Sequence, residues 1–343
     1  MTVVLPSPRM IEVDSVPTLR WGIIGTGIAG PFVRAMHLHT TQRAVAVAAR
    51  NPEKTRTFAR EHAIEVVYDD ASALFADPSI DVVYISTPHP QHHRLALEAI
   101  AAGKHALIEK PIAMSAAEAH EITDAGERAG LLVMEAMWTR YLPQSDIIRQ
   151  LLADGALGQV NAVDANFGFS APYDPEGRMW NKDLGGGALL DAGVYPISFA
   201  SSVLGAPTSI TAKGTLTSTG VDATAGLLLE HSDGSVALVA TSMVTSVPTT
   251  ATIMGSLGRL DVVSPFFGPT GLEVRTGSLG QEQTVAWRDE RFDVLHDGMA
   301  DEIVAFASYV AEGRTESPIH PHHEIVSVMN TIDEARRQIG TAS

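Results

Sequence analysis

The sequence predicts an α/β N-terminal domain with a doubly wound parallel Rossmann sheet, followed by an α+β domain with a large, mainly antiparallel sheet that is open on one face. Between residues 20 and 135, continuous apolar runs alternate with helical segments, which is typical of a parallel sheet covered on both faces. From about residue 208 to 285, the runs are rich in Thr, Val and Ser and are joined by glycine-containing turns, as in antiparallel sheets. The length of 343 residues also exceeds the usual size of one hydrophobic core.

Five strands are expected in the first domain, each a short apolar run that precedes a helical pattern. They span residues 21–24, 45–48, 81–85, 105–108 and 131–133. Asn51, followed by proline, is typical of a helix start, and Ser115 with Glu118 has the spacing of a capping box. Gly103 and Gly130 stand where helices should end. The helix boundaries therefore agree with the alternation of strands and helices.

The second domain begins where the pattern changes near residue 137. The expected elements are a helix at 143–153, a long strand at 159–169, strands at 210–217, 223–230 and 236–244, and a last helix at 324–339. We therefore predict a flexible arm at residues 1–18, a first domain at 19–137 and a second domain at 138–343, whose last helix can pack back on the first domain. Within a single chain, one face of the antiparallel sheet is expected to stay uncovered.

The composition sets limits on the surroundings and partners of the protein. The absence of cysteine excludes disulfides, thiolate metal sites and thiol nucleophiles, and it fits a reducing cytoplasm. The formal charge of -16 argues against non-specific binding to nucleic acid or anionic membranes, because both are negatively charged. We find no run of about 18 apolar residues that would cross a bilayer, and residues 1–18 lack the pattern of a signal peptide. A cytoplasmic protein is expected.

A glycine-rich motif follows the first expected strand and opens the first expected helix. It reads Gly25, Thr26, Gly27, Ile28, Ala29 and Gly30. In such a motif the first glycine permits a tight turn, the second lets the backbone approach a pyrophosphate, and the third allows close packing of the helix, whose N-terminus binds the anion. A merely structural turn is the alternative, but the surrounding strand–helix–strand pattern favours a dinucleotide site.

The residue about twenty positions beyond the motif indicates which dinucleotide is bound. Arg50 stands there, at the end of the second expected strand, where NAD-dependent enzymes usually carry Asp or Glu. Lys54 and Arg56 follow and complete a basic cluster in an otherwise acidic chain. Because a guanidinium binds phosphate through two parallel hydrogen bonds, the cluster favours the 2′-phosphate of NADP(H) over NAD(H). The alternative is a solvated helix start.

Two further motifs carry groups suited to acid–base chemistry. Glu109, Lys110 and a proline follow the fourth expected strand, on the sheet edge where ligands of open α/β folds bind. A lysine there can bond a substrate hydroxyl and lower the pKa of a neighbouring acid. Asp191 and Tyr195 follow three glycines and, if helical, share one face, with a proline that would bend the helix just past the tyrosine. Either motif alone is compatible with a structural role.

Taken together, these motifs resemble the Gfo/Idh/MocA family, named for glucose-fructose oxidoreductase and inositol dehydrogenase. The resemblance covers nearly the whole chain and rests on four segments, residues 25–30, 81–88, 109–111 and 191–195. Within the family, the chain looks most similar to the branch of dimeric dihydrodiol dehydrogenase and NADP-dependent D-xylose dehydrogenase. This closer similarity lies in residues 87–92, 135–140 and 186–191.

The resemblance implies a set of site residues. Lys110 would be catalytic and Asp191 would contact the substrate. Many members carry a histidine proton acceptor four residues after the aspartate, whereas this chain has Tyr195, as its most similar branch does. The ordinary pKa of tyrosine is about 10, so the tyrosine needs a nearby cation, for which Lys110 is the candidate.

The resemblance also extends to the surroundings of the cofactor and the substrate. It assigns Arg50 and Lys54 to the 2′-phosphate pocket and Phe167 to the substrate, although an aromatic residue on a strand is more often part of sheet packing. The remaining expected cofactor contacts are Thr87, His89, His92, Glu109, Lys110, Trp138 and Arg140. Relatives associate through the open sheet face, so a homodimer or homotetramer is expected.

Two groups of histidines raise the question of a metal site. They lie at residues 89, 92 and 93 and at residues 320, 322 and 323. Neither group has an acidic or cysteine partner at ligand spacing, so no metal is expected. The second group is expected in a loop.

The sequence therefore predicts reversible hydride transfer between a sugar or cyclic diol carbinol and C4 of NADP(H), with Tyr195 and Lys110 as the acid–base pair and Asp191 orienting the substrate or the lysine. One alternative is an NADPH-dependent reductase of a keto-sugar or anhydro-sugar. An NAD-dependent glycosidase is a second, which Arg50 disfavours. A cofactor-sensing regulator without catalysis is a third, which the retained acid–base residues disfavour. The substrate is not indicated, because residues 172–183 match no motif.

Overall fold

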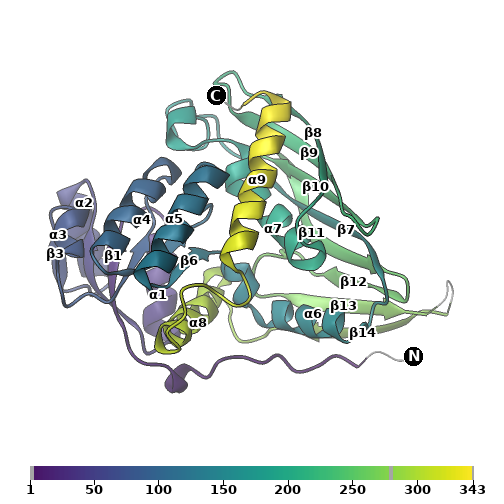
Figure 1. The fold of residues 1–343 in the computed structure, drawn as a ribbon, viewed down its shortest axis with the longest axis horizontal. Helices are drawn as coiled ribbons and strands as arrows, with labels where there is room; N and C mark the ends of the chain where they lie inside the picture. The colour runs from purple at the N-terminus through teal and green to yellow at the C-terminus, as the bar shows by residue number, and fades with distance from the viewer. Residues whose placement is uncertain (1–3, 278–280, 342–343) are drawn as a thin grey trace. The chain divides into compact units, whose positions relative to one another are not determined.

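The computed structural model describes residues 4–277 and 281–341, which form two compact units. The parallel-sheet unit comprises residues 10–141 and 293–326. The mixed-sheet unit comprises residues 4–9, 142–277, 281–292 and 327–341. Figure 1 labels the helices and strands of both units.

The parallel-sheet unit contains a six-stranded sheet in the order β3-β2-β1-β4-β5-β6, in which all neighbouring strands are parallel. Its strands are β1 (Arg20–Ile24), β2 (Arg43–Ala48), β3 (Val66–Tyr68), β4 (Val82–Ile85), β5 (His105–Glu109) and β6 (Val133–Ala136). The strand order reverses between β1 and β4, and ligands of such sheets bind beyond the carboxyl ends of the strands at this point. The predicted doubly wound parallel fold is confirmed.

Helices α1 to α5 connect successive strands of the parallel sheet (Figure 1), and further helices of this unit lie outside these connections. The helices of the unit are α1 (Ala29–His39), α2 (Pro52–Glu61), α3 (Ala71–Phe75), α4 (His92–Ala101), α5 (Ala116–Ala129) and α8 (Met299–Ala311), with short helices η1 (Val13–Ser15), η2 (His89–Gln91), η3 (Trp138–Tyr141) and η6 (Leu295–Gly298). The predicted strands match β1, β2, β4 and β5, whereas β6 begins at Val133 rather than at residue 131. The edge strand β3 was not predicted, because three residues with Val66 and Val67 41% and 37% exposed leave only a weak pattern.

The predicted helix boundaries are explained by local hydrogen bonds. The side chain of Asn51 accepts hydrogen bonds from two N–H groups of the first turn of α2, at 3.1 and 3.0 Å. Ser115 Oγ accepts from the N–H of Glu118 at 3.3 Å, but the Glu118 carboxylate accepts from the N–H of Met114 at 2.9 Å and not from that of Ser115. The capping box therefore closes one residue earlier than predicted. Gly130 ends α5 with a φ of 66°.

The mixed-sheet unit contains an eight-stranded sheet in the order β14-β13-β12-β11-β7-β10-β9-β8. Its strands are β7 (Val160–Ser170), β8 (Ser209–Leu216), β9 (Asp222–Glu230), β10 (Val236–Ser242), β11 (Val244–Gly255), β12 (Gly258–Val262), β13 (Gly271–Thr276) and β14 (Gln283–Arg288). Neighbouring strands are antiparallel, except that β7 and β10 are parallel. The second predicted sheet, mainly antiparallel, is confirmed.

One face of this sheet is covered by helix and the other is more exposed. Helix α7 (Val194–Leu204) packs on β7, β10 and β11. Along β10, Ala237 and Val239 are 0% and 3% exposed, whereas Leu238 between them, on the opposite face, is 46% exposed. Because successive side chains of a strand point to opposite faces, this alternation shows the predicted open face.

Two further helices complete the chain, α6 (Pro143–Ala153) and α9 (His322–Ile339). Residues 322–326 of α9 belong to the parallel-sheet unit and the remainder to the mixed-sheet unit. The last helix therefore begins two residues before the predicted residue 324, and in the second histidine group only His320 lies in a loop.

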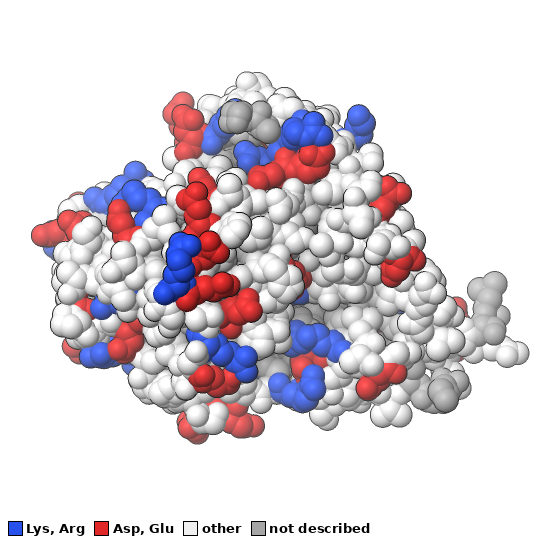
Figure 2. Space-filling model, in the orientation of Figure 1, with Lys and Arg blue, Asp and Glu red and all other residues white. Residues whose placement is uncertain are grey.

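The helical stretch Lys182–Leu204 is long and apolar enough to cross a bilayer, but 67% of its most apolar window is buried in the structure. The core helix of a soluble protein meets the same criterion, so this stretch is weak evidence for a membrane span. On the face drawn in Figure 2, acidic and basic side chains are interspersed.

Candidate active site

The glycine-rich loop joins β1 to α1 at the point where the strand order reverses. Gly25 has a φ of 95°, and a Cβ there would lie 2.9 Å from the carbonyl oxygen of Ser86 in the loop after β4. Only glycine fits both conditions. A Cβ at Gly27 would meet nothing within 4 Å, and the neighbouring Ile28 is 45% exposed. The backbone from Thr26 to the start of α1 therefore has open space for a pyrophosphate, as the motif predicts.

The third glycine of the motif has a different surrounding from the one predicted. A Cβ at Gly30 would lie 3.4 Å from the ring of His62, which is an ordinary contact. Gly22, inside β1, is the glycine that permits close helix packing, because a Cβ there would lie 2.5 Å from Leu74 of α3. The close packing predicted for Gly30 is thus wrong. The tight contact between a strand and a helix lies instead at Gly22 in β1.

Several groups near this loop suit a dinucleotide. Arg50 lies two residues beyond the end of β2, Lys54 lies in the first turn of α2, and both side chains are exposed. The Thr87 hydroxyl is buried and has no hydrogen-bond partner within the described residues. A buried polar group without a partner is rare in a folded protein and indicates a missing water or ligand. The open glycine loop, the exposed cations and this hydroxyl fit a nicotinamide dinucleotide.

Three buried side chains hold the backbone around Lys110, which itself is half-buried. The Glu109 carboxylate accepts the N–H of Lys110 at 3.1 Å. The His92 ring lies 2.9 Å, through Nδ1, from the carbonyl oxygen of the residue that follows Lys110. Glu135 Oε1 accepts the next N–H, that of Ile112, at 2.9 Å. The lysine is therefore presented from a fixed backbone at the carboxyl end of β5.

The surroundings of these groups affect their ionisation. Burial raises the pKa of Glu109, although the charge of Lys110 and the hydrogen bond donated by Tyr84 partly offset this effect. Burial, and next the charge of Glu109, hold the pKa of Glu302 well above its ordinary value. Burial lowers the pKa of His92, so its ring is neutral and donates to only one of the two backbone carbonyls that it contacts. Burial is thus the largest cause of the shift in each of these three groups.

The other predicted cofactor residues of this unit are largely internal. His89, Trp138 and Arg140 are 6%, 2% and 6% exposed. Arg140 Nη2 donates to the carboxylate of Glu324 and lies 3.3 Å from Nδ1 of His320. Burial raises the pKa of Glu324, but the His320 hydrogen bond and the Arg140 charge outweigh it and lower the pKa to about 2. Arg140 thus has a structural ion pair, and its predicted contact with the cofactor stays a prediction.

The mixed-sheet unit contains Tyr195 within an aromatic cluster. Its ring centroid lies 5.8 Å from that of Phe167 on β7 and 5.2 Å from that of Phe267, and the two phenylalanines are 4.7 Å apart. Asp191 accepts a hydrogen bond from Arg178 Nη2 at 2.8 Å. Within the described residues, Arg178 Nη1 is buried without a hydrogen-bond partner. An apolar surface and an ion pair therefore flank the two predicted substrate residues.

The helical segment that carries Asp191 and Tyr195 departs from α-helical geometry before the tyrosine and is a regular α-helix from there on. Residues Leu189–Gly193 form a π-helix, and α7 continues through Pro196 to Leu204. A proline ring clashes with the carbonyl four residues earlier in an α-helix, and here that carbonyl belongs to Ala192. Pro196 lies in the first turn of α7, where its missing N–H breaks no bond within that helix, and the bend predicted just past Tyr195 stays a prediction. Short π-helical segments of this kind are frequent at functional sites.

A buried carboxyl anchors the start of this segment. Asp222 Oδ2 accepts the N–H of Leu189 at 2.6 Å, and burial raises the pKa of Asp222. A Cβ at Gly187 would lie 2.4 Å from Asp222 Oδ1, and Gly187 has a φ of 119°. Trp180, Ala188, Val221 and Met243 form the small core beneath it. The glycine run is therefore required to bring the backbone against Asp222.

The predicted site residues are divided between the units. The cofactor residues and Lys110 belong to the parallel-sheet unit, whereas Phe167, Asp191 and Tyr195 belong to the mixed-sheet unit. Sequence reasoning missed Arg178 and Phe267, and it missed that His92 and Glu135 hold the lysine loop. These roles depend on residues far apart in the chain, so only topology reveals them.

Comparisons with known proteins agree with the predicted family and fold. A model described as "Oxidoreductase family, NAD-binding Rossmann fold" matches residues 19–137, and one described as "GFO/IDH/MocA C-terminal domain" matches residues 146–261. Trans-1,2-dihydrobenzene-1,2-diol dehydrogenase from Sus scrofa is 35% identical over 328 residues, which cover 94% of this chain and 97% of the relative. The enzyme of the same name from Xenopus tropicalis is 34% identical over 336 residues, with 94% and 98% covered.

Solved structures show the same fold over nearly the whole chain. KijD10, a 3-ketoreductase from Actinomadura kijaniata in complex with NADP and TDP-benzene, is similar with a TM-score of 0.83 and 26% identity, covering 94% of this chain and 98% of that chain. A levoglucosan dehydrogenase in complex with NADH and levoglucosan has a TM-score of 0.83 and 21% identity, with 95% and 98% covered. This second likeness shows the fold alone.

Replacing Gly187 by Ala should lower the free energy of unfolding by about 1–3 kcal/mol, because a strained backbone conformation and a contact with Asp222 are both forced on the alanine. Gly226→Ala is the matched control, since a Cβ there meets nothing within 4 Å, and its change should stay within about 0.5 kcal/mol. Urea denaturation measures both. Equal stability of the two variants would contradict the anchoring of this segment.

Replacing Glu324 by Gln should cost about 3 kcal/mol of stability at neutral pH, and the cost should shrink in acid. The folded pKa of about 2 lies below the ordinary 4.5, so the stabilisation is fully present above pH 4.5 and is lost as the pH falls toward 2. Glu334→Gln is the control, because that carboxylate has a similar pKa but pairs with the exposed Arg337, where solvent screens the effect. Denaturation curves measured from pH 7 to 3 give the free energy of unfolding of both proteins. A difference between wild type and Glu324→Gln that stays constant over this range would refute the role of the ion pair.

Proposed function

The chain belongs to the Gfo/Idh/MocA oxidoreductase family, and from this we propose that it transfers hydride reversibly between the carbinol carbon of a sugar or cyclic diol and C4 of NADP(H). The observation that carries the proposal is the pairing of an open glycine loop with a lysine held rigidly at the same sheet edge. The dihydrodiol dehydrogenases that resemble this chain support the diol as substrate class.

The preference for NADP(H) rests on Arg50 and Lys54. Both are exposed next to the carboxyl end of β2, where the 2′ position of the ribose is bound in dinucleotide sites of this kind. Neither position carries the carboxylate that would bond a free 2′-hydroxyl. The NADP complex of the similar 3-ketoreductase supports the same preference.

In the proposed mechanism the open glycine loop would hold NADP(H), which would serve as hydride acceptor or donor when bound. Tyr195 takes the hydroxyl proton of the substrate as the carbinol carbon loses its hydride and becomes a carbonyl. A tyrosine with an ordinary pKa of about 10 is a weak base at neutral pH, so the charge of Lys110 is needed beside it. Asp191 orients the substrate hydroxyls or the lysine, with Arg178 fixing the carboxylate at 2.8 Å.

The substrate class follows from the groups around Tyr195. Phe167 and Phe267 form an apolar surface beside the tyrosine ring, and such a surface suits the flat or apolar face of a ring. Asp191 and Arg178 supply polar groups for hydroxyls. A cyclic diol or a sugar ring combines these two features, so we propose a small ring substrate.

Reduction of a keto-sugar with NADPH is the second candidate function. It uses the same residues in the opposite direction, with Tyr195 returning a proton to the new alkoxide. The likeness to a 3-ketoreductase at 26% identity favours it. We further propose that the protein acts in the cytoplasm as a homodimer or homotetramer associated through the open face of the mixed sheet.

Changing both Arg50 and Lys54 to Ala should reduce kcat/KM for NADP by about 10- to 100-fold, because hydrogen bonds to a charged phosphate are lost. The kcat/KM for NAD should change by less than about twofold. Arg60→Ala, at the exposed end of the same helix, is the matched control and should leave both values unchanged. An equal loss with NAD and NADP would show that these residues do not bind the 2′-phosphate.

Lys110→Ala and Tyr195→Phe should each lower kcat by about 100-fold or more, since a positioned acid–base group contributes this much. The measurement is the nicotinamide absorbance with NADP and a panel of aldoses, inositols and dihydrodiols. Lys213→Ala and Tyr68→Phe are controls on exposed or edge strands and should retain wild-type rates. Wild-type rates in both Lys110→Ala and Tyr195→Phe would exclude the proposed pair.

A further inference from the structure

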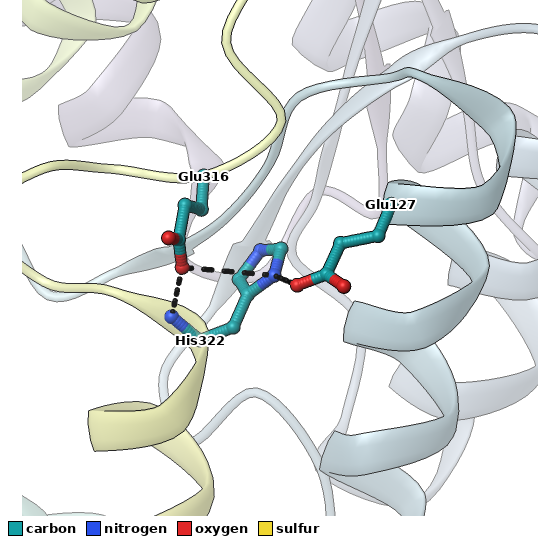
Figure 3. Close-up of side chains that lie close together, drawn as sticks. All are labelled: Glu127, Glu316 and His322. Atoms are coloured by element: carbon teal, nitrogen blue, oxygen red, sulfur yellow. Dashed lines mark hydrogen bonds and ion pairs between the residues drawn. The ribbon is translucent and has the colours of Figure 1, made fainter.

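Three segments of the parallel-sheet unit bring one potential ligand each to a common point. Figure 3 shows Glu127 on α5, Glu316 on the loop that precedes α9 and His322 at the start of α9, with their side chains directed toward one another. One carboxylate oxygen of each glutamate and one ring nitrogen of the histidine all lie within 4.8 Å of one another. The histidine is 4% exposed, whereas the glutamate side chains are 53% and 42% exposed.

The hydrogen bonds of His322 define the state of its ring. Nε2 lies 3.0 Å from the carbonyl oxygen of Val133, and a carbonyl can only accept, so Nε2 carries a hydrogen. In the neutral ring, Nδ1 then carries a lone pair and no hydrogen. That lone pair faces Glu127 Oε1 at 3.0 Å and Glu316 Oε2 at 3.9 Å, and both of these are also acceptors. Three acceptor atoms that face one another repel. A cation between them, either a proton on Nδ1 or a metal ion, removes this repulsion.

The geometry suits a metal ion better than a proton. A proton on Nδ1 reaches Glu127, but Glu316 Oε2 is too far at 3.9 Å to share it. The backbone N–H of His322 donates to Glu316 Oε2 at 2.7 Å and so holds that oxygen near the ring. A tetrahedral zinc ion with bonds near 2.0–2.1 Å needs donor atoms about 3.3 Å apart, which lies between the two observed separations.

The contact of His322 Nε2 with the carbonyl of Val133 also favours a metal ion at Nδ1. Histidines that bind a metal through one nitrogen almost always donate the other N–H to a carbonyl or carboxylate, which fixes the tautomer. His322 already has this arrangement through Val133. An imidazole nitrogen also favours zinc and similar transition metals over magnesium or calcium. The two exposed glutamates leave a path for the ion from solvent.

We propose that Glu127, Glu316 and His322 bind one divalent transition-metal ion, with water completing its coordination. Binding displaces the proton from Nδ1 when the ring is charged, and the ion then bridges α5, the loop and α9. The N–H of Val133 already bonds the carbonyl of Thr315 at 3.0 Å, so the ion reinforces an existing attachment of this loop. The sequence predicted no metal because the acidic partners of His322 are not its neighbours in the chain.

A zinc titration of the metal-free full-length protein, with a competing chromophoric chelator, tests the proposal. The double variant Glu127→Gln and Glu316→Gln should bind zinc at this site at least tenfold more weakly than wild type. Its melting temperature in chelator should match that of wild type, because both substitutions keep size and lie at the surface. Glu334→Gln, at a half-buried carboxylate on the same helix α9, is the matched control and should bind zinc as wild type does.

Anomalous diffraction at the zinc edge then locates the ion. We expect a peak within bonding distance of His322 Nδ1 and both glutamates in the wild-type crystal, and none there in the double variant. Zinc peaks only elsewhere on the chain, or equal zinc affinity in wild type and double variant, would overturn the proposal.

Discussion

A buried carboxylate, Glu135, holds together the segments on which the candidate active site depends. Its Oε1 accepts the N–H of Ile112, just after Lys110, and its Oε2 lies 2.9 Å from Nε2 of His320. Buried charges persist only when they are paired and hydrogen-bonded, and removal of one partner is strongly destabilising. The Glu135 carboxylate therefore connects the loop after β5 with the residues before α9. His320 in turn contacts Arg140. The backbone that presents Lys110 is thus part of the core.

Polar groups at the carboxyl ends of the parallel strands fall into two kinds. Glu109, His92 and Glu135 are buried, and their hydrogen bonds hold backbone within the unit. Arg50 and the hydroxyl of Thr87 lie beside the open glycine loop and are suited to a ligand. Burial raises the pKa of Glu109. The exposed cation near the glycine loop gives a chain with a formal charge of -16 a local basic group that suits an anion.

Much of the fold follows from local sequence, whereas the site depends on contacts that no local pattern encodes. Continuous apolar runs predicted β1, β2, β4 and β5, and the side chain of Asn51 caps α2 as its position indicated. The sequence did not predict the π-helix at Leu189–Gly193 that precedes Tyr195. The ion pair between Arg140 and Glu324 and the contact of His322 with Glu127 were not predicted because the two members of each pair lie far apart in the chain.

The proposed function requires that hydride passes directly between the carbinol carbon and the nicotinamide. The most direct test uses dihydrodiols, inositols and aldoses deuterated at the carbinol carbon, incubated with the protein and NADP, followed by proton NMR of the NADPH formed. We expect deuterium at C4 of NADPH, on one face of the ring, for at least one of these substrates. NADPH without deuterium, or no reduction of NADP by any substrate of the panel, would contradict the proposed function.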